Sequence, residues 1–489
     1  MEITDEDVAT HLEKTPLVVD LDGTLLRTDL LLESALRLIK QKPWSVLILP
    51  IWLLKGRAYL KSRIYQLVQI DVSLLPLNGE LSTWLRKEKT RGRPLILATA
   101  SDYQQARSVV EPLGLFDVVL GSDGKQNLKG PQKLRLVVET CGDKFDYVGN
   151  SIADLEVWRK CRHAVLVDAP PRLERWARRL AKVTRVFAAP GAGITDILRA
   201  MRCHHWVKNL LLLVPAITSH TIFDGIVAGR ASLAFLSFGF CASTAYIVND
   251  LLDLEEDRHH HVKKRRPFAS GQMSIGSGLL LALACLLASA VTAGFVPRGF
   301  LAVLVSYLVL TCLYSFFLKR LLVVDVLTLA LLYTLRIVAG SQATAIVLSP
   351  WLLSFAFFLF LSLAFLKRAG DLVQHRTNRN VLPGRSYTAA DLEVVSLAGM
   401  CSGFISSLIL ALYINSDTVQ LLYQRPTLLW GLQPILLYYI TRLWIICRRG
   451  ELTDDPIEHV AKEPSTYGAA FLAILVLLAA TFDFKFFTP

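Results

Sequence analysis

Long apolar runs dominate the sequence after residue 198 and constrain its fold more than any other feature. Several of these runs approach the roughly 20 residues that a helix needs to cross the hydrocarbon core of a bilayer. Because lipid offers backbone groups no water, each run predicts a helix. The expected spans are about 205–222, 230–249, 277–296, 299–317, 321–341, 350–366, 395–415, 427–446 and 468–487. The C-terminal part is therefore predicted to be an all-α bundle of nine transmembrane helices.

The distribution of basic residues predicts how this bundle is oriented. Lysines and arginines crowd the loops on one side, as at 263–266, 319–320 and 367–368, and are sparse on the other. By the positive-inside rule the basic loops face the cytoplasm, which predicts a multi-pass protein of the inner (cell) membrane. Nine spans then place the N-terminal domain on the cytoplasmic side. This topology accounts for the net charge of +12 without a nucleic-acid partner.

Two further features narrow the class of protein. The acidic N-terminal stretch 1–16 has no apolar core, so it predicts no ordinary signal peptide. The eight cysteines form no CxxC pair, which excludes the common zinc and redox motifs. The sequence predicts no particular oligomeric state.

The first 182 residues predict a Rossmann-like α/β domain. Short apolar strands alternate with helical stretches such as 102–112 and 131–141, a pattern typical of a parallel sheet covered on both faces. The predicted strands are 17–21, 94–98, 146–149 and 164–168. Catalytic and ligand sites in such sheets lie at the carboxyl ends of the strands.

An insertion at about 30–85 is expected to form a helical cap over the site of this domain. It contains the apolar stretch 43–54, which is too short to span a bilayer and is suited to touch the membrane surface. Residues 183–198 are expected to be a linker, and residues 199–489 the membrane domain.

Acidic residues cluster where the second predicted span ends. Asn249, Asp253 and Asp257 are spaced i, i+4, i+8, and Asp250 falls on the same face of a helix. These carboxylates would repel one another at a membrane boundary, and a divalent cation removes that conflict. Oxygen ligands that leave room for phosphates suit Mg²⁺. The basic run 263–266 follows, so Lys264 and Arg266 are expected to bind a diphosphate; a solvated charged loop is the alternative.

The acidic cluster and the basic run after it resemble the first aspartate-rich motif of the UbiA superfamily of intramembrane prenyltransferases, which are nine-helix bundles. The segment 314–325 resembles the second motif of that family. The resemblance implies that Asp250 and Asp253 are catalytic and hold Mg²⁺ with their neighbours. It also implies that Lys319 contacts a phosphate, that Tyr314 lines the site and that Asp325 belongs to a second metal or substrate cluster.

Arg336 lies inside the fifth predicted span. A charge within a membrane segment indicates a functional site by default, here one that binds substrate, and a helix-packing salt bridge is the alternative.

Two short motifs indicate a subfamily. The segments 206–209, with Lys208 and Asn209, and 365–371, with Lys367 and Arg368, are similar to those of polyprenyl-phosphate phosphoribosyltransferases. The resemblance implies that polyprenyl phosphate attacks phosphoribosyl pyrophosphate, whose leaving pyrophosphate Mg²⁺ holds. The three cations would lie at the lipid phosphate, although lysines and arginines at span ends also extend to lipid headgroups without a catalytic role.

Other functions remain open for the membrane half. An aromatic prenyltransferase of the same superfamily would use a prenyl diphosphate instead. A transporter is a further alternative, but the sequence lacks the paired inverted repeats with broken helices that transporters often have.

A second acidic pair follows the first predicted strand of the α/β domain. In Asp20-Leu-Asp22-Gly23-Thr24, the first carboxylate could attack a phosphate and the second could protonate the leaving oxygen. The same pattern also occurs in calcium loops and turns, and the preceding strand favours the catalytic interpretation.

These residues resemble the first motif of the haloacid dehalogenase-like (HAD) phosphatases. Segments 97–101 and 127–130 resemble the next two motifs, which implies that Thr99 and Lys129 contact phosphate, with Lys133 as the alternative lysine. Segment 149–154 resembles the fourth, which implies that Asp154 holds Mg²⁺ together with Asp20 and Asp22. The family usually has Gly-Asp at the start of that motif, and this chain has Gly149-Asn150.

The two halves suggest one sequence of reactions. Transfer of phosphoribose to a lipid phosphate leaves a 5-phosphate on the sugar, which a fused phosphatase could remove to give polyprenyl-phosphoryl-ribose. The alternative is that the HAD-like domain is regulatory or acts on something else. The expected partners are phosphoribosyl pyrophosphate, a polyprenyl phosphate and the lipid bilayer.

Overall fold

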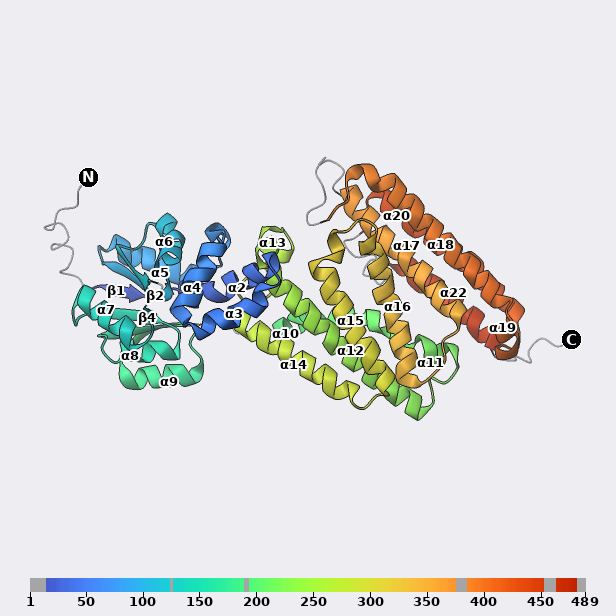
Figure 1. Ribbon diagram of the computed structural model, residues 1–489, viewed down its shortest axis with the longest axis horizontal. Helices are drawn as coiled ribbons and strands as arrows, with labels where there is room; N and C mark the ends of the chain where they lie inside the picture. Colours follow the sequence, from blue (N-terminus) through green and yellow to red (C-terminus); the bar gives the residue numbers. More distant parts are fainter. Residues whose placement is uncertain (1–14, 124–125, 189–192, 375–384, 453–462, 482–489) are drawn as a thin grey trace. The chain divides into compact units, whose positions relative to one another are not determined.

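The computed structural model describes residues 15–123, 126–188, 193–374, 385–452 and 463–481 (Figure 1). The acidic N-terminal stretch up to residue 14 and the end of the last predicted span lie outside these ranges. The chain divides into two compact units. One comprises Met1–Cys203 with Tyr246–Ala284, and the other comprises His204–Ala245 with Cys285–Pro489.

A six-stranded parallel sheet forms the centre of the N-terminal domain, in the order β3-β2-β1-β4-β5-β6. The strands are β1 Leu17–Val19, β2 Leu95–Asp102, β3 Val118–Ser122, β4 Asp146–Gly149, β5 His163–Val167 and β6 Lys182–Phe187. The four predicted strands are confirmed. The two outer strands were not predicted: β6 is mostly exposed and contains Lys182 and Arg185, and β3 is apolar but only partly buried. Strand β6 also occupies the first part of the expected linker 183–198, so the sheet extends beyond residue 182.

Successive residues of a strand point to opposite faces of the sheet, so alternate side chains belong to two separate hydrophobic cores. Leu17 and Val19 point to one face, where α5 Gly79–Thr90 and α6 Tyr103–Val110 pack. Val18 points to the other, where α7 Pro131–Cys141, α8 Leu155–Trp158 and α9 Pro171–Leu180 pack. The predicted helices at 102–112 and 131–141 are therefore confirmed as covers of the sheet.

The predicted insertion is helical. It consists of α2 Leu30–Gln41, α3 Ser45–Leu54, α4 Arg57–Leu67 and the 3-10 helix η1 Val72–Leu74 (Figure 1). Helix α5 belongs to the core under the sheet, so the insertion ends before it. Large apolar side chains of helix α3 and of Trp44, which precedes it, are exposed: Trp44 is 76%, Leu47 70% and Leu54 88% exposed. The ten residues of α3 extend about 15 Å, roughly half the thickness of a bilayer core.

The C-terminal part is helical. Eight of its described helices are long and apolar enough to cross a membrane. The α-helices of these eight spans are α12 Gly225–Leu252, α14 Ile275–Ala293, α15 Arg298–Phe316, α16 Val324–Thr344, α17 Pro350–Gln374, α18 Leu392–Ile414, α20 Leu432–Arg449 and α22 Pro464–Thr481. The first expected span, 205–222, instead contains the 3-10 helix η4 Cys203–Leu213 and the short helix α11 Val214–Thr218. The count of nine spans and the orientation derived from it stay predictions.

A buried carboxylate at the start of β4, that of Asp146, contacts two arginines and the first residue of β5. Asp146 accepts hydrogen bonds from Arg162 (Nε, 3.1 Å) and from the backbone N–H of His163 (3.1 Å), and it pairs with Arg93. Burial alone would raise the pKa of Asp146, but these hydrogen bonds and charges outweigh it and lower the pKa.

We expect Asp146→Asn to destabilise the sheet by about 1–3 kcal/mol, because Arg162 loses its anionic partner and Arg93 keeps only Glu88. Amide hydrogen exchange of β1 and β4 in the full-length protein should accelerate accordingly. The lowered pKa means that the Asp146 contribution is present above the ordinary carboxyl pKa and is lost as the pH falls through the folded-state pKa. The variant should lack that part of the acid sensitivity, whereas Asp143→Asn, at an exposed neighbouring position, should retain it. Equal exchange in the wild type and Asp146→Asn would contradict this role.

Candidate active sites

The loop after β1 brings Asp20 and Asp22 to the carboxyl edge of the sheet. The backbone N–H of Asp20 donates to Val148 O of β4 (3.0 Å), so the loop starts in register with two strands. Gly23 has a φ of +72°, a conformation that favours glycine. A Cβ atom at Gly23 would lie 2.1 Å from Nδ2 of Asn150. The turn therefore needs glycine for both its backbone angle and its close approach to the loop after β4.

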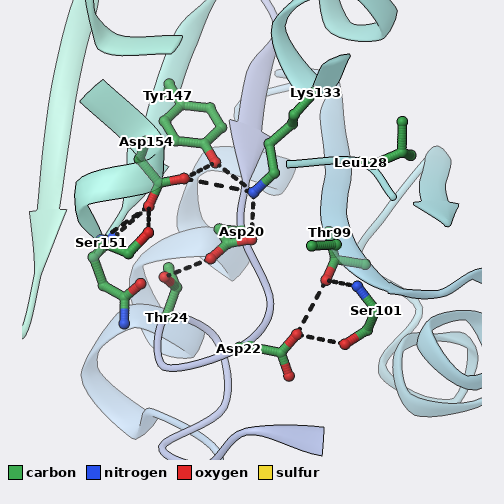
Figure 2. Close-up of polar contacts among 12 residues, drawn as sticks. Asp20, Asp22, Thr24, Thr99, Ser101, Leu128, Lys133, Tyr147, Ser151 and Asp154 are labelled. Carbon is green, nitrogen blue, oxygen red and sulfur yellow. Dashed lines mark hydrogen bonds and ion pairs between the residues drawn. The ribbon is translucent and has the colours of Figure 1, made fainter. Parts of the chain in front are cut away.

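Asp20 is balanced by Lys133 of α7 (Figure 2). Nζ of Lys133 lies 2.8 Å from Asp20 Oδ1, donates to Tyr147 Oη at 3.0 Å and lies 3.5 Å from Asp154 Oδ1. Burial raises the pKa of Asp20 to about 7, although the Lys133 ammonium acts in the opposite direction. The lysine at this carboxylate is thus Lys133, the alternative to the expected Lys129, whose side chain is exposed.

Asp22 is held by the end of β2 and the start of α2. Its Oδ2 accepts from Ser101 Oγ (2.5 Å) and Thr99 Oγ1 (3.3 Å), and its Oδ1 accepts from the backbone N–H of Leu30 (2.9 Å). Burial also raises the pKa of Asp22. The raised pKa favours the protonated form that an acid catalyst needs, and the three donors around Asp22 hold its carboxyl group in place. Thr99, expected at phosphate, contacts this acid in the structure.

Asp154 orders the loop that follows β4. Its Oδ2 accepts from the backbone N–H groups of Asn150 (3.1 Å) and Ser151 (2.9 Å), and its Oδ1 accepts from Tyr147 Oη (2.7 Å) (Figure 2). These bonds present the Asn150 side chain to Gly23, next to the Asp20–Asp22 loop. Asn150 therefore occupies the position at which the resembled fourth motif usually has an aspartate.

The described residues contain no group of three or more His, Cys, Asp or Glu side chains arranged to hold a metal ion. Asp20, Asp22 and Asp154 therefore do not converge as a three-carboxylate site. A carboxylate oxygen of Asp20 and the amide oxygen of Asn150 are nevertheless hard donors on neighbouring loops of this site. Mg²⁺ usually takes only one or two protein carboxylates and completes its shell with water and substrate phosphate, so this donor set fits it.

The acidic motif of the membrane half lies at the junction of two helices. Asn249 and Asp250 end α12, Asp253 separates it from α13 Leu254–His259, and Asp257 lies on α13. The i to i+4 backbone bonds continue through the junction, from Asp253 N to Asn249 O and from Asp257 N to Asp253 O. The backbone therefore keeps the predicted i to i+4 spacing, but among the described residues these carboxylates form no group of three arranged to hold a metal ion either.

Cations meet each carboxylate of this motif. Arg266 bridges Asp250 (3.1 Å) and Asp257 (2.6 Å), and Arg202 lies 2.5 Å from Asp250. Burial raises the pKa of Asp257 to about 6 against the effect of Arg266. Arg266 was predicted, whereas Arg202 was missed because nothing in its local sequence marks it. Lys264, also predicted, is exposed on the 3-10 helix η5 Lys263–Arg265.

Asp253 has partners of its own in the same unit. It accepts from Asn249 Nδ2 (2.9 Å) and pairs with Lys40 of α2 (2.6 Å). A second, buried ion pair between Glu33 and Arg258 also joins α2 to α13. The insertion of the α/β domain is thereby joined to the acidic motif by charge.

A third polar cluster surrounds the fully buried Asp325 at the start of α16. It forms an ion pair with Arg368 (Nε to Oδ2, 2.9 Å) and accepts a hydrogen bond from Tyr387 Oη (2.7 Å), and Arg385 lies 3.3 Å away. Arg385 also donates to Tyr314 Oη at 3.4 Å. The structure thus brings together three predicted residues, Tyr314, Asp325 and Arg368. Arg385 and Tyr387 were missed because the chain reaches this cluster again only after a long separation.

Arg368 differs from the expectation that it faces a lipid headgroup. Its side chain is completely buried and also pairs with Asp371 at 2.5 Å. It can orient Asp325 and Asp371, but it does not lie at a solvent-facing helix end. Lys319 lies in the 3-10 helix η6 Leu318–Arg320 and Lys367 in α17, and both are partly buried.

Arg336 is buried in the middle of α16 and bonded to neutral groups. It donates to Asn209 Oδ1 (3.2 Å), Tyr307 Oη (2.9 Å) and Leu332 O (2.7 Å). Within the described part of the chain no carboxylate pairs with it, so the salt-bridge alternative is not supported there. Lys208 lies over the ring of Tyr333, which also stacks under Arg336. The predicted residues Lys208, Asn209 and Arg336 therefore share one buried cationic site.

Comparison with known proteins supports the membrane half. The family model "UbiA prenyltransferase family" matches residues 212–444. An uncharacterised protein of Sinorhizobium fredii, y4nM, is 34% identical over 95% of this chain and 90% of its own length. Decaprenyl-phosphate phosphoribosyltransferase of Mycobacterium tuberculosis is 32% identical over 42% of this chain and 70% of its own.

Among solved structures, a UbiA homolog from Archaeoglobus fulgidus bound to DMAPP and Mg²⁺ is similar at 19% identity. The match covers 58% of this chain and 96% of that one, with a TM-score of 0.44. Together, the spanning helices, the family match and the relatives above 30% identity lead to one assignment. The chain is an integral membrane protein that belongs to the UbiA prenyltransferase family.

Proposed function

We propose that the membrane half transfers 5-phosphoribose from phosphoribosyl pyrophosphate to a polyprenyl phosphate, and that a fused HAD-type phosphatase then removes the 5-phosphate. The product is polyprenyl-phosphoryl-ribose. One observation carries the proposal: a chain related to a decaprenyl-phosphate phosphoribosyltransferase also holds the Asp20–Lys133–Asp22 arrangement of a phosphoester-cleaving site. Both activities are expected on the cytoplasmic side of the inner membrane.

The acidic motif suits the sugar donor. Asp250, Asp253 and Asp257 with Asn249 would hold Mg²⁺, which when bound neutralises the leaving pyrophosphate. Arg202 and Arg266 already lie at Asp250, within reach of a phosphate placed there. The buried cationic site of Lys208 and Arg336 suits a second anion, since the hydrogen-bond acceptors of Arg336 are neutral. Asp325, Arg385 and Arg368 form a separate charged cluster that would order the helices around the substrates.

The α/β domain suits hydrolysis of the sugar phosphate. Asp20 attacks phosphorus, a P–O bond to Asp20 forms, and the ester P–O bond breaks. Lys133 neutralises charge on the phosphoryl group, and Asp22 delivers its proton to the departing sugar oxygen. Water then cleaves the aspartyl phosphate and regenerates Asp20.

Charge pairs support a direct link between the two activities. Helix α2 of the phosphatase insertion reaches the acidic motif through Glu33–Arg258 and Lys40–Asp253. Both side chains of the Glu33–Arg258 pair are buried, so breaking it would leave a buried charge without a partner. A lipid product held in the membrane would meet the second activity at a high effective concentration.

The transferase proposal predicts a labelled lipid. Purified protein in bilayers, given radiolabelled phosphoribosyl pyrophosphate, polyprenyl phosphate and Mg²⁺, should transfer label to the lipid phase, and chelation with EDTA should stop the transfer. Asp250→Asn should lower the rate by about 100-fold, since a carboxylate at the diphosphate is lost. Glu451→Gln, the same change at an exposed position, serves as the control. If only a prenyl diphosphate and an aromatic acid react, the protein is an aromatic prenyltransferase and the proposal is wrong.

The phosphatase proposal predicts an intermediate. Asp20→Asn should leave transfer intact and accumulate the 5-phosphorylated lipid, which mass spectrometry distinguishes from the dephosphorylated product. Glu139→Gln, at an exposed position on α7, should form the same product as the wild type. Without accumulation in Asp20→Asn, the HAD-like domain must act on another substrate or be regulatory.

A further inference from the structure

Lys61 brings a cation from the insertion to the carboxyl edge of the sheet. It lies on α4, and its Nζ donates to Ala100 O at 2.5 Å and to Asn127 Oδ1 at 3.2 Å. Ala100 stands between Thr99 and Ser101, the two residues that hydrogen-bond Asp22. The insertion therefore places an ammonium group beside the acid of the site.

The charge of Lys61 is not balanced by an ion pair. Both of its hydrogen-bond acceptors are neutral, and among the described residues no carboxylate lies within 4.0 Å of its Nζ. Burial lowers the pKa of Lys61, Asp22 and Asp29 act against this, and the nearby cations Lys129 and Arg57 reinforce it. The ammonium group of Lys61 has thus lost part of its hydration while its hydrogen-bond acceptors are neutral, so an anionic ligand would add a favourable charge interaction.

This anion is not the phosphate that is cleaved. Lys133 Nζ already donates to Oδ1 of Asp20, the attacking carboxylate, at 2.8 Å. Lys61 instead lies on the side of Asp22, which protonates the oxygen that departs. An anion at Lys61 consequently belongs to the leaving group.

We propose that Lys61 is a specificity residue that binds a second negatively charged group, a phosphate or phosphodiester, on the leaving-group side of a phosphomonoester substrate. The inference rests on the phosphatase half of the proposed function and names its substrate class. A lipid-linked ribose 5-phosphate has this chemistry, because its C1 carries a phosphodiester. The exposed apolar helix α3, two residues before α4 on the same insertion, fits a substrate that arrives from a lipid surface.

A matched pair of probes tests the inference on the full-length protein. One is ribose 5-phosphate, and the other is ribose 5-phosphate with a methyl phosphodiester at C1, so that both carry the same cleavable ester. We expect the wild type to favour the diester probe by about 10- to 100-fold in kcat/KM, the range of a hydrogen bond to a charged group. Lys61→Met should reduce this preference to near one, and Lys61→Arg should retain most of it.

Using the ratio removes effects that the two probes share, including any change in Asp22 or in the amount of folded protein. Lys42→Met, at an exposed lysine of the same insertion, should keep the wild-type ratio. A wild-type ratio near one, or a ratio that Lys61→Met leaves unchanged, would overturn the role of Lys61 while phosphate release from both probes upholds the phosphatase. If the wild type releases phosphate from neither probe, the phosphatase proposal itself fails and the inference with it.

Discussion

Charges buried away from water must be met by fixed opposite charges or by polar hydrogen-bond partners, and this requirement organises both halves of the protein. Lys133 lies between Asp20 and Asp154 and thereby joins α7, the loop after β1 and the loop after β4. Asp325 is completely buried and is met by Arg368 of α17. Removing either partner would leave a charge in a medium that cannot solvate it. The polar clusters therefore determine which segments meet, in addition to any chemistry they perform.

The parallel sheet decides where the soluble site forms. Every strand points its carboxyl end to the same edge, so the loops after β1, β2 and β4 meet there. The insertion then adds Lys61 from α4 and, through α2, the charge pairs with the acidic motif of the membrane half. One inserted segment thus contacts both candidate sites.

Local sequence predicted the motifs well but not all of their partners. Asp20, Asp22 and Thr99 lie together as expected, because each follows or ends a strand of the sheet. The choice between Lys129 and Lys133 could not be made from spacing, since Lys129 lies in the third motif, Lys133 lies three residues after it, and only the direction of α7 separates them. Arg202 and Tyr387 complete their clusters from distant segments with no local signature. Edge strand β6 was missed because its exposed positions carry basic and polar residues in place of the apolar pattern by which the central strands are recognised, and β3, which is apolar, was missed as well.

The sequence by itself determined the classes of structure and the chemical groups. Apolar length requires membrane helices, alternation of strands and helices requires a covered parallel sheet, and the aspartate motifs supply the oxygens. Only the tertiary structure decided which charges meet. It buried Arg368 against Asp325, surrounded Arg336 with neutral acceptors and set Lys61 beside Asp22. The reason is physical: pairing of buried charges depends on distances between segments far apart in the chain, and no local pattern records those distances.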